Sequence, residues 1–389
     1  MTALNSLPDF LHAAAATKRG ITFIESGDTE TTLSYSDLLS RANALLALLQ
    51  DRGLGPGDEM IFLLKDNQAF VEMFWACVLG GIVPVPVATG ISDEHRAKVY
   101  RIFNKLEKPH LYTESATLDR LSAFAEAHEL KADFEKIQSK TLLTEQTIEA
   151  SGAGTSHTIQ PDDIAFIQFS SGSTSDPKGV VLSHTNIVTN CLAINSTAGI
   201  TEQDTVLSWM PLTHDMGLIG MHLCSVAATL HHILIPTELF SRRPLLWLQL
   251  ISDKKANVTC SPNFGYKHYL KALGDKALEN FDLSHVRLIF NGAEPISLQL
   301  CDEFLTHMQN YGLAREAMFT VYGLAEASLA VAFPPPQTHF RSVSVNRHRL
   351  NPGNKVEYVD SADQNAVQFA IEGKTVANCQ VRIADNNHQ

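Results

Sequence analysis

The sequence predicts an α/β fold built from two α/β subdomains, each with a mostly parallel sheet flanked by helices. Strand-like and helix-like segments alternate along most of the 389 residues, a pattern that favours parallel sheets. Hydrophobic residues make up 44% of the chain and charged residues 19%, as in ordinary globular enzymes. The length exceeds one typical domain of about 150 residues. We therefore expect more than one compact unit with a large buried core.

The first subdomain is predicted over residues 1–160. Residues 21–33 indicate a hairpin, and Ser34 and Asp37 begin a capping-box-like helix start that leads to a helix ended by Gly53. A strand over 60–64, a helix over 69–79 and a strand over 82–87 follow. Residues 151–156 are expected to be a surface linker.

The second subdomain is predicted over residues 161–330. Short apolar runs, each followed by a turn or a helix, indicate buried strands over residues 164–169, 206–210, 232–236, 258–261, 286–290 and 318–322. The pattern weakens over residues 331–372, and residues 373–389 form a last separate segment.

Composition argues against several classes of protein. The net charge of −12 disfavours a nucleic-acid partner, which needs a basic face. The six cysteines are scattered without zinc spacing, as in reduced core thiols. The N-terminus lacks a signal-peptide pattern, and the most apolar stretch, residues 70–88, is interrupted by Glu72 and two prolines, so we expect no membrane span. A cytoplasmic location is the resulting expectation.

A loop of small hydroxylated residues carries the sharpest chemical signal. It reads Ser170-Ser171-Gly172-Ser173-Thr174-Ser175-Asp176-Pro177-Lys178-Gly179 and lies between two apolar runs. Glycine and serine let backbone N–H groups turn toward an anion, and Lys178 adds a positive charge, which suits a polyphosphate. A Walker loop is disfavoured because Gly172 and Lys178 do not match its spacing and the next segment is strand-like. A solvent-exposed Ser/Gly turn is the alternative.

This loop resembles the phosphate-binding signature of the adenylate-forming superfamily, which includes acyl-CoA ligases, luciferases and peptide-synthetase adenylation domains. Ser175 stands where many members carry glycine, a departure similar to that of fatty acyl-AMP ligases. The resemblance implies the large N-terminal domain of that fold, with ATP and Mg²⁺ as cofactors. It also implies that ATP is bound by Ser170, Ser171, Gly172, Ser173, Thr174 and Lys178.

A second motif, residues 209–220 with the sequence WMPLTHDMGLIG, resembles the segment that borders the acyl pocket in fatty acyl-AMP ligases. The resemblance implies that His214 borders the substrate carboxylate and α-phosphate. It places Met216, Gly217 and Ile219 beside an apolar acyl tunnel. Taken alone, a histidine after a strand is more often a turn residue, and Asp215 is a candidate cap for the following helix.

A third motif, Asn291-Gly292-Ala293-Glu294, follows the strand predicted over 286–290. Pro295 is typical of the first position of a helix, so we expect a helix to begin there. Parallel sheets bind nucleotides at the carboxyl ends of their strands. An ordinary strand-to-helix turn fits the residues equally well. The resemblance makes these four residues part of the AMP site, where residues 292–294 form the adenine wall.

A fourth motif, Tyr322-Gly323-Leu324-Ala325-Glu326, follows the strand predicted near residue 318. A tyrosine ring can stack on adenine, and a carboxylate can hold Mg²⁺ against phosphate oxygens. A buried tyrosine followed by a capping glutamate is the alternative. The resemblance implies that residues 322–325 bind the nucleotide, that Glu326 and Thr174 hold the metal, and that the catalytic residues are Lys178, His214 and Glu326.

The last part of the chain departs most from the superfamily. Fatty acyl-AMP ligases carry an insertion at residues 331–372, and the weak periodicity there fits either an inserted hairpin or a longer loop. Residues 373–389 weakly resemble the next superfamily segment. We expect the ribose-binding aspartate, the hinge and the C-terminal domain with its catalytic lysine to be absent, and adenylation to be impaired as a result.

The resemblance implies a fatty acyl-AMP ligase, in which a fatty carboxylate attacks the α-phosphorus of MgATP and pyrophosphate leaves. The acyl group would then pass to the phosphopantetheine thiol of an acyl-carrier protein. An acyl-CoA ligase shares the same motifs. An amino-acid adenylation domain needs a pocket carboxylate, for which Asp215 is a single candidate. A module that binds ATP or acyl-AMP without turnover is the remaining alternative.

Overall fold

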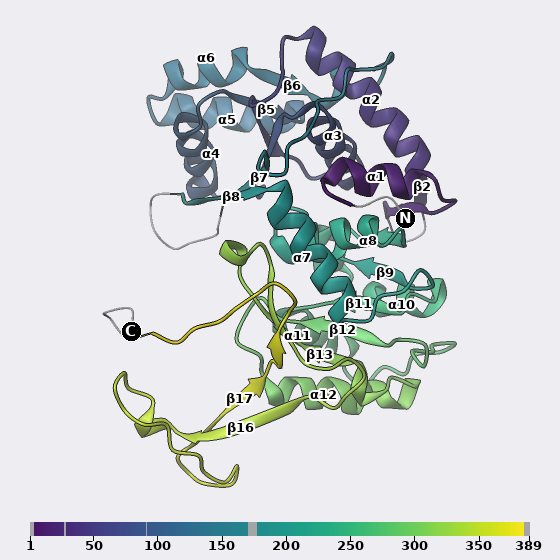
Figure 1. The fold of residues 1–389 in the computed structure, drawn as a ribbon, viewed down its shortest axis with the longest axis vertical. Helices are drawn as coiled ribbons and strands as arrows, with labels where there is room; N and C mark the ends of the chain where they lie inside the picture. The colour runs from purple at the N-terminus through teal and green to yellow at the C-terminus, as the bar shows by residue number, and fades with distance from the viewer. Residues whose placement is uncertain (1–3, 27–28, 91, 170–176, 385–389) are drawn as a thin grey trace.

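The computed structural model describes residues 4–26, 29–90, 92–169 and 177–384. Two sheets dominate the fold, and the predicted α/β class is confirmed (Figure 1). The upper sheet in Figure 1 is parallel and has the strand order β4-β3-β5-β6. Its strands are β3 (Glu59–Leu63), β4 (Val83–Pro86), β5 (Pro109–Thr113) and β6 (Thr141–Leu143). The helices that accompany it are α2 (Tyr35–Asp51), α3 (Asn67–Gly80), α4 (Asp93–Lys105), α5 (Ser115–Ala127) and α6 (Lys131–Ser139).

The larger sheet has seven strands in the order β13-β12-β11-β9-β10-β1-β2. All neighbours are parallel except the β1–β2 hairpin. The strands are β1 (Gly20–Ile24), β2 (Glu30–Ser34), β9 (Thr205–Ser208), β10 (His231–Leu234), β11 (Val258–Cys260), β12 (Leu288–Asn291) and β13 (Met318–Thr320). Every residue of β1 is buried, which requires cover on both faces, and its parallel pairing with β10 places it inside this sheet. Strands from the first 160 residues thus join strands that follow residue 200, and the predicted subdomain boundaries stay a prediction.

Helices pack against and between the two sheets, as Figure 1 shows. The segments near the middle of the molecule are α1 (Leu7–Ala15), α7 (His184–Thr197), the π-helix η2 (Met216–Leu223) and α8 (Cys224–Ala227). Those that follow along the larger sheet are α9 (Thr237–Arg242), α10 (Leu245–Lys254), α11 (Asn263–Leu273) and α12 (Leu298–Met308). Short 3-10 turns are η1 (Thr144–Gln146), η3 (Gln309–Tyr311), η4 (Arg315–Ala317), η5 (Ala325–Ala327) and η6 (Arg347–Arg349). One continuous apolar core joins α1, α2 and α3 to the larger sheet.

Three smaller antiparallel units complete the fold. Strands β7 (Ile164–Phe169) and β8 (Gly179–Ser183) pair on either side of the predicted phosphate loop. A second unit contains β14 (Tyr322–Gly323), β15 (Ala330–Phe333) and β18 (Lys374–Thr375). The third, β16 (Arg341–Asn346) with β17 (Ala366–Ile371), forms the lower end of the molecule in Figure 1. Residues 331–372 therefore contain a paired hairpin, and its assignment as a family insertion stays a prediction.

Local sequence signals explain several helix ends. The Ser34 hydroxyl accepts the Asp37 amide at 3.0 Å at the start of α2, and Gly81 ends α3 with a positive φ of 68°. The expectation that a helix begins at Pro295 is wrong, since α12 begins at Leu298 with Ser297 as its cap. The reason is a tertiary contact: Asn263 donates to the Pro295 carbonyl at 2.7 Å and accepts the Ser297 amide at 3.0 Å.

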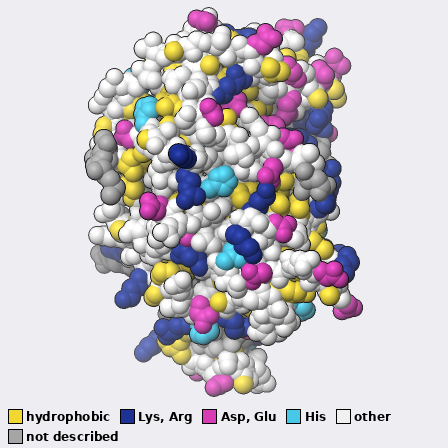
Figure 2. Space-filling view, turned by 90° about the vertical axis from the view of Figure 1, so that its right-hand side faces the viewer, with side chains coloured by type: hydrophobic (Ala, Val, Ile, Leu, Met, Phe, Trp, Pro, Cys, Tyr) yellow, Lys and Arg dark blue, Asp and Glu magenta, His cyan; other side chains and the backbone are white. Residues whose placement is uncertain are grey.

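The structure also shows the distribution of surface charge, the character of the helices and the state of the cysteines. On the face shown in Figure 2, acidic and basic side chains are interspersed. No helix in the described ranges combines the length and the apolar character that crossing a bilayer requires. The six cysteines are free thiols, and all except the half-buried Cys379 lie in the core.

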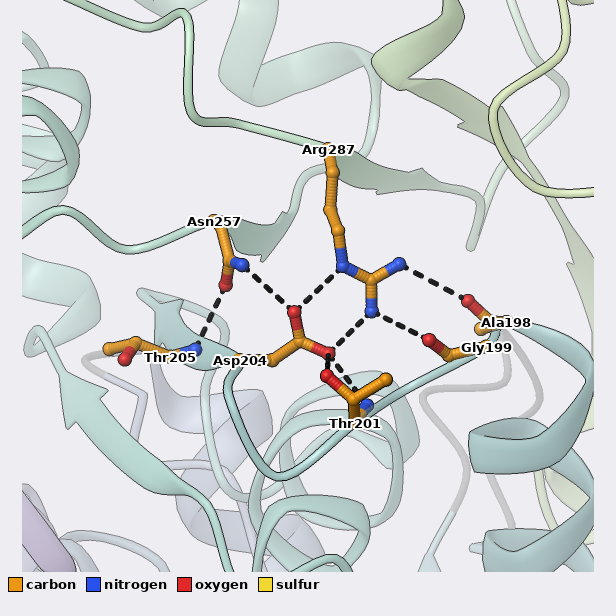
Figure 3. Close-up of polar contacts among 7 residues, drawn as sticks. All are labelled: Ala198, Gly199, Thr201, Asp204, Thr205, Asn257 and Arg287. Carbon is orange, nitrogen blue, oxygen red and sulfur yellow. Dashed lines mark hydrogen bonds and ion pairs between the residues drawn. The ribbon is translucent and has the colours of Figure 1, made fainter.

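A buried ionic network joins the amino ends of three parallel strands (Figure 3). Asp204, directly before β9, accepts from Arg287 Nε at 2.7 Å and from Asn257 Nδ2 at 2.8 Å; these two residues directly precede β12 and β11. The Asp204 side chain is only 2% exposed. Burial opposes its ionisation, but hydrogen bonds from Arg287 and the Thr201 amide outweigh burial and hold the pKa of the carboxyl below its usual value.

Replacing Arg287 with methionine should lower the free energy of unfolding by about 3–5 kcal/mol, because it leaves a buried carboxylate without its counter-charge. Urea denaturation measures the loss. Arg315→Met is the control, since its partner Asp302 is exposed and such surface pairs contribute at most about 1 kcal/mol. Equal losses in the two variants would contradict the importance assigned to the network.

Two neutral histidines are buried in the core, one on a strand of the larger sheet and one on the helix η2. His222 on η2 and His232 on β10 are fully buried, with ring centroids 5.7 Å apart. Trp75 Nε1 donates to His222 Nε2 at 3.0 Å, whereas neither ring nitrogen of His232 has a hydrogen-bond partner among the described residues. Burial lowers the pKa of His222 to about 3 and that of His232 well below its ordinary value.

The free energy of unfolding should therefore fall as the pH decreases below about 6.5, the usual histidine pKa. Only the unfolded chain binds protons at these positions, so their contribution is complete above that pH and is lost toward the folded pKa. Each histidine lowers the free energy of unfolding by up to about 1.4 kcal/mol for each unit by which the pH falls in this range. Urea midpoints between about pH 7 and pH 5 measure the slope. We expect a shallower slope for His232→Leu and an unchanged one for the exposed control His348→Leu; identical slopes in both variants would disprove the assignment.

Candidate active site

A pocket of about 260 Å³ opens where the carboxyl ends of β12 and β13 face the start of η2. Part of its lining carries polar side chains or exposed backbone, namely His214, Asp215, Ala293, Tyr322, Gly323 and Leu324. Another part is apolar and contains Ile194, Met221, Phe290, Val321, Leu329 and Phe333. Met216, Gly220 and Ala330 complete it. The pocket thus brings together residues from three of the four motifs found in the sequence.

His214 and Asp215 form the polar entry to η2. Asp215 Oδ1 lies 2.7 Å from His214 Nδ1 and accepts the Met216 amide at 2.7 Å. The predicted capping role of Asp215 is confirmed by this contact. The Met216 amide also lies 3.2 Å from His214 Nδ1, but the carboxylate is closer and charged, so we assign a proton to Nδ1. The carboxylate therefore fixes the orientation of a side chain that is 41% exposed.

The residues expected beside an acyl tunnel are placed differently from one another. Met216 lines the pocket, whereas Gly217 and Ile219 are buried and do not belong to its described lining. Gly217 permits a close backbone approach, because a Cβ there would lie 2.2 Å from the Pro211 carbonyl oxygen. Ile219 packs in the main core. Their predicted acyl-binding role stays a prediction.

The Asn291–Glu294 motif contributes one residue, Ala293, to the pocket. Asn291 is fully buried, and its amide nitrogen lies 3.1 Å from the Cys301 sulfur. Gly292 is buried behind the lining, and Glu294 accepts the Phe264 amide at 3.1 Å. Ala293 adopts a φ of +72°, which is uncommon for a residue with a Cβ and marks a strained turn at the pocket wall.

The Tyr322–Glu326 motif supplies an exposed aromatic wall. Tyr322 is 45% exposed and, with Gly323, forms strand β14 against β15. The Leu324 amide donates to the Leu329 carbonyl at 2.9 Å, which closes the turn around η5. Ala325 and Glu326 lie on η5 outside the pocket lining, and the Glu326 side chain is exposed. A half-exposed ring beside the backbone of Ala293 and Gly323 suits a flat heteroaromatic ligand.

The phosphate-loop residues Ser170, Ser171, Gly172, Ser173 and Thr174 lie outside the described residues. Lys178 is exposed directly before β8. Among the predicted metal ligands the structure describes Glu326, and within the described ranges no three His, Cys, Asp or Glu side chains gather as a metal cage. A lone exposed carboxylate fits Mg²⁺ that also binds water and substrate phosphates, because this ion seldom uses an all-protein cage.

Comparison with known proteins decides the family. The family model described as AMP-binding enzyme matches residues 10–387. The chain belongs to the AMP-binding enzyme family. Its fold is that of the N-terminal part of adenylation domains and fatty acyl-AMP ligases in this family, as predicted.

Relatives within the AMP-binding family include acyl-activating ligases. A protein of Caulobacter vibrioides provisionally named an acyl-CoA synthetase is 31% identical and aligns with 94% of this chain and 63% of its own length. The medium-chain-fatty-acid–[acyl-carrier-protein] ligase JamA of Moorena producens is 27% identical over 95% of this chain and 62% of JamA. The chain thus spans less than two thirds of the length of these relatives.

Among solved structures, a fatty acyl-adenylate ligase from L. pneumophila in complex with acyl adenylate and pyrophosphate superposes with a TM-score of 0.86. It is 28% identical, and the match covers 95% of this chain and 64% of that protein.

Several lining residues of this AMP-binding family member escaped the sequence analysis. Phe290 and Val321 directly precede two recognised motifs, so their position was a usable signal. Ile194 and Phe333 come from distant segments and carry no motif. Asn190 holds β15 in place by donating to the Ala330 carbonyl and accepting the Ala330 amide, both at 2.9 Å, a role that only the tertiary structure shows.

Replacing Tyr322 with alanine should weaken AMP binding by about 1–3 kcal/mol, the usual effect of removing an aromatic ring from a base. Isothermal titration of this chain with AMP measures the change. Tyr322→Phe should retain most of the affinity because it keeps the ring. Tyr358→Ala is the control, since Tyr358 is 74% exposed and lies outside the pocket lining. Wild-type affinity in Tyr322→Ala would exclude stacking on Tyr322.

Proposed function

We propose that this chain activates a fatty acid with ATP, forming acyl-adenylate and releasing pyrophosphate. The observation that supports the proposal is a single pocket with two kinds of wall. His214, Ala293 and Tyr322 offer polar or aromatic contacts, and Ile194, Met221 and Phe333 offer an apolar surface. A fatty acid bound next to the adenosine part of ATP matches this combination, because the acid brings a carboxylate and an alkyl chain and ATP brings the adenine.

In the proposed reaction a carboxylate oxygen of the fatty acid bonds to the α-phosphorus of ATP. At the same time the bond between the α-phosphorus and the oxygen that bridges it to the β-phosphate breaks, so pyrophosphate leaves. The protein contributes position and charge rather than covalent chemistry. His214, held by Asp215, orients the carboxylate. Tyr322 and the strained turn at Ala293 hold the adenine. Lys178 attracts the β- and γ-phosphates, together with the predicted contacts of residues 170–174.

Glu326, with Thr174, would hold Mg²⁺, which neutralises charge on the leaving pyrophosphate when bound. Glu326 is suited to this role because its carboxylate is exposed and adjoins the turn that carries Tyr322.

We further propose that the acyl group passes to the phosphopantetheine thiol of an acyl-carrier protein. JamA, which is named for that transfer, supports this acceptor. The relative named as an acyl-CoA synthetase supports coenzyme A as the alternative acceptor. Binding of acyl-adenylate without turnover is the second alternative.

The test is ATP–pyrophosphate exchange with this chain, measured with radiolabelled pyrophosphate and a series of fatty acids and amino acids. We expect exchange that depends on a fatty acid and is lost in Lys178→Ala, because the substitution removes a charge from the phosphate site. Lys271→Ala, an exposed lysine on α11, should behave as wild type.

Exchange driven by amino acids would overturn the substrate class. Absence of exchange, with acyl-adenylate still bound, would favour the module without turnover.

A further inference from the structure

The π-helix η2 lines the pocket from its first residue, Met216, as far as Met221. Met216, Gly220 and Met221 line the pocket, and Met221 is the last lining residue on the helix. Met216 and Met221 are five residues apart, the spacing of the i→i+5 hydrogen bond of a π-helix. Met221 therefore lies farther along η2 than Met216 from His214 and Asp215, where the substrate carboxylate would bind. Met221 is 3% exposed, and we take it as the inner wall of the pocket on η2 because no later residue of this helix belongs to the lining.

Along η2, the pocket ends at packed core residues directly after Met221. His222 and Leu223 are fully buried. The hydrogen bond from Trp75 to His222 fixes η2 against α3, and Trp75 is itself fully buried. A longer ligand thus finds no open path along η2, and moving the helix would break a buried polar contact.

The wall beside Met221 leaves little spare room. A Cβ at Gly220 would lie 2.9 Å from Leu329 Cδ2, so the Leu329 side chain already fills the space beside this glycine. Ile194 and Phe333 add two more bulky side chains. The whole pocket, which in the proposed function also takes the adenine, measures about 260 Å³, below the range of roughly 300–1,000 Å³ that is usual for small-molecule sites.

We propose that Met221 determines the acyl chain length, so that the pocket takes medium or shorter acyl chains and rejects long ones. This inference rests on the proposed function and assigns its substrate class. Each methylene that reaches apolar surface should raise affinity by about fourfold. The gain ends where the chain meets Met221, since further methylenes stay in water or displace packed side chains.

Binding of non-reacting acyl-sulfamoyl-adenosine analogues tests the inference without requiring turnover. Isothermal titration of the wild-type chain compares acetyl, octanoyl and palmitoyl analogues. We expect the octanoyl analogue to bind more tightly than the acetyl one and at least tenfold more tightly than the palmitoyl one. Equal affinity for octanoyl and palmitoyl analogues overturns the inference. Failure of all three to bind overturns the proposed function itself.

Met221→Ala should raise palmitoyl affinity at least tenfold relative to octanoyl, because it opens the inner wall. Met308→Ala removes the same volume from a buried methionine outside the pocket lining and should keep the wild-type ratio. An unchanged ratio in a folded Met221→Ala overturns the inference.

Gly220→Ala provides an independent test, because the added methyl presses only on the tip of Leu329. The substitution should narrow the pocket beside η2 and reduce the preference for the octanoyl analogue over the acetyl analogue. A preference equal to that of the wild type would count against a tight wall at this part of η2.

Discussion

One buried carboxylate holds together the strands that lead to the candidate site. It lies at the amino ends of these strands, and the pocket lies at their carboxyl ends. Asp204 joins Arg287 and Asn257, and these three residues directly precede β9, β12 and β11. Because the strands are parallel, fixing their amino ends also fixes their relative register, as in the pairing of Val258 with both Val206 and Leu288. Of these strands, β12 leads to Ala293 in the pocket, and it pairs with β13, which leads to Tyr322. A buried carboxylate at the amino ends of the strands thus contributes to the placement of residues at their carboxyl ends.

Sequence alone predicted what local patterns determine. Buried parallel strands read as apolar runs, and the cap at Ser34 and the turn at Gly81 have their own residue signals. The motifs at His214, Ala293 and Tyr322 were found because their residue types and order are distinctive, and the structure brings them to one pocket. The same reasoning failed at Pro295, where Asn263 binds the backbone and delays the helix.

What the sequence could not reveal is mostly long-range. Ile194 and Phe333 reach the pocket from segments without a motif, and the Asp204 network joins residues more than fifty positions apart. A π-helix has no distinct hydrophobic pattern, so the position of Met221 on the inner wall followed only from the coordinates. Function sits in side chains that a parallel sheet collects from distant positions, as is usual for open α/β folds.

The pairing of β1 with β10 also constrains how the chain is made. Ile21 pairs with Leu33 of β2 close by in the sequence, but on its other side with His232, more than two hundred residues later. All five residues of β1 are buried in the finished fold. The strands β3 to β6 pair only with one another, so their sheet needs no strand from the later part of the chain, whereas the cover of β1 does. Folding of the larger sheet therefore depends on contacts between residues far apart in the sequence, which are typically slow to form.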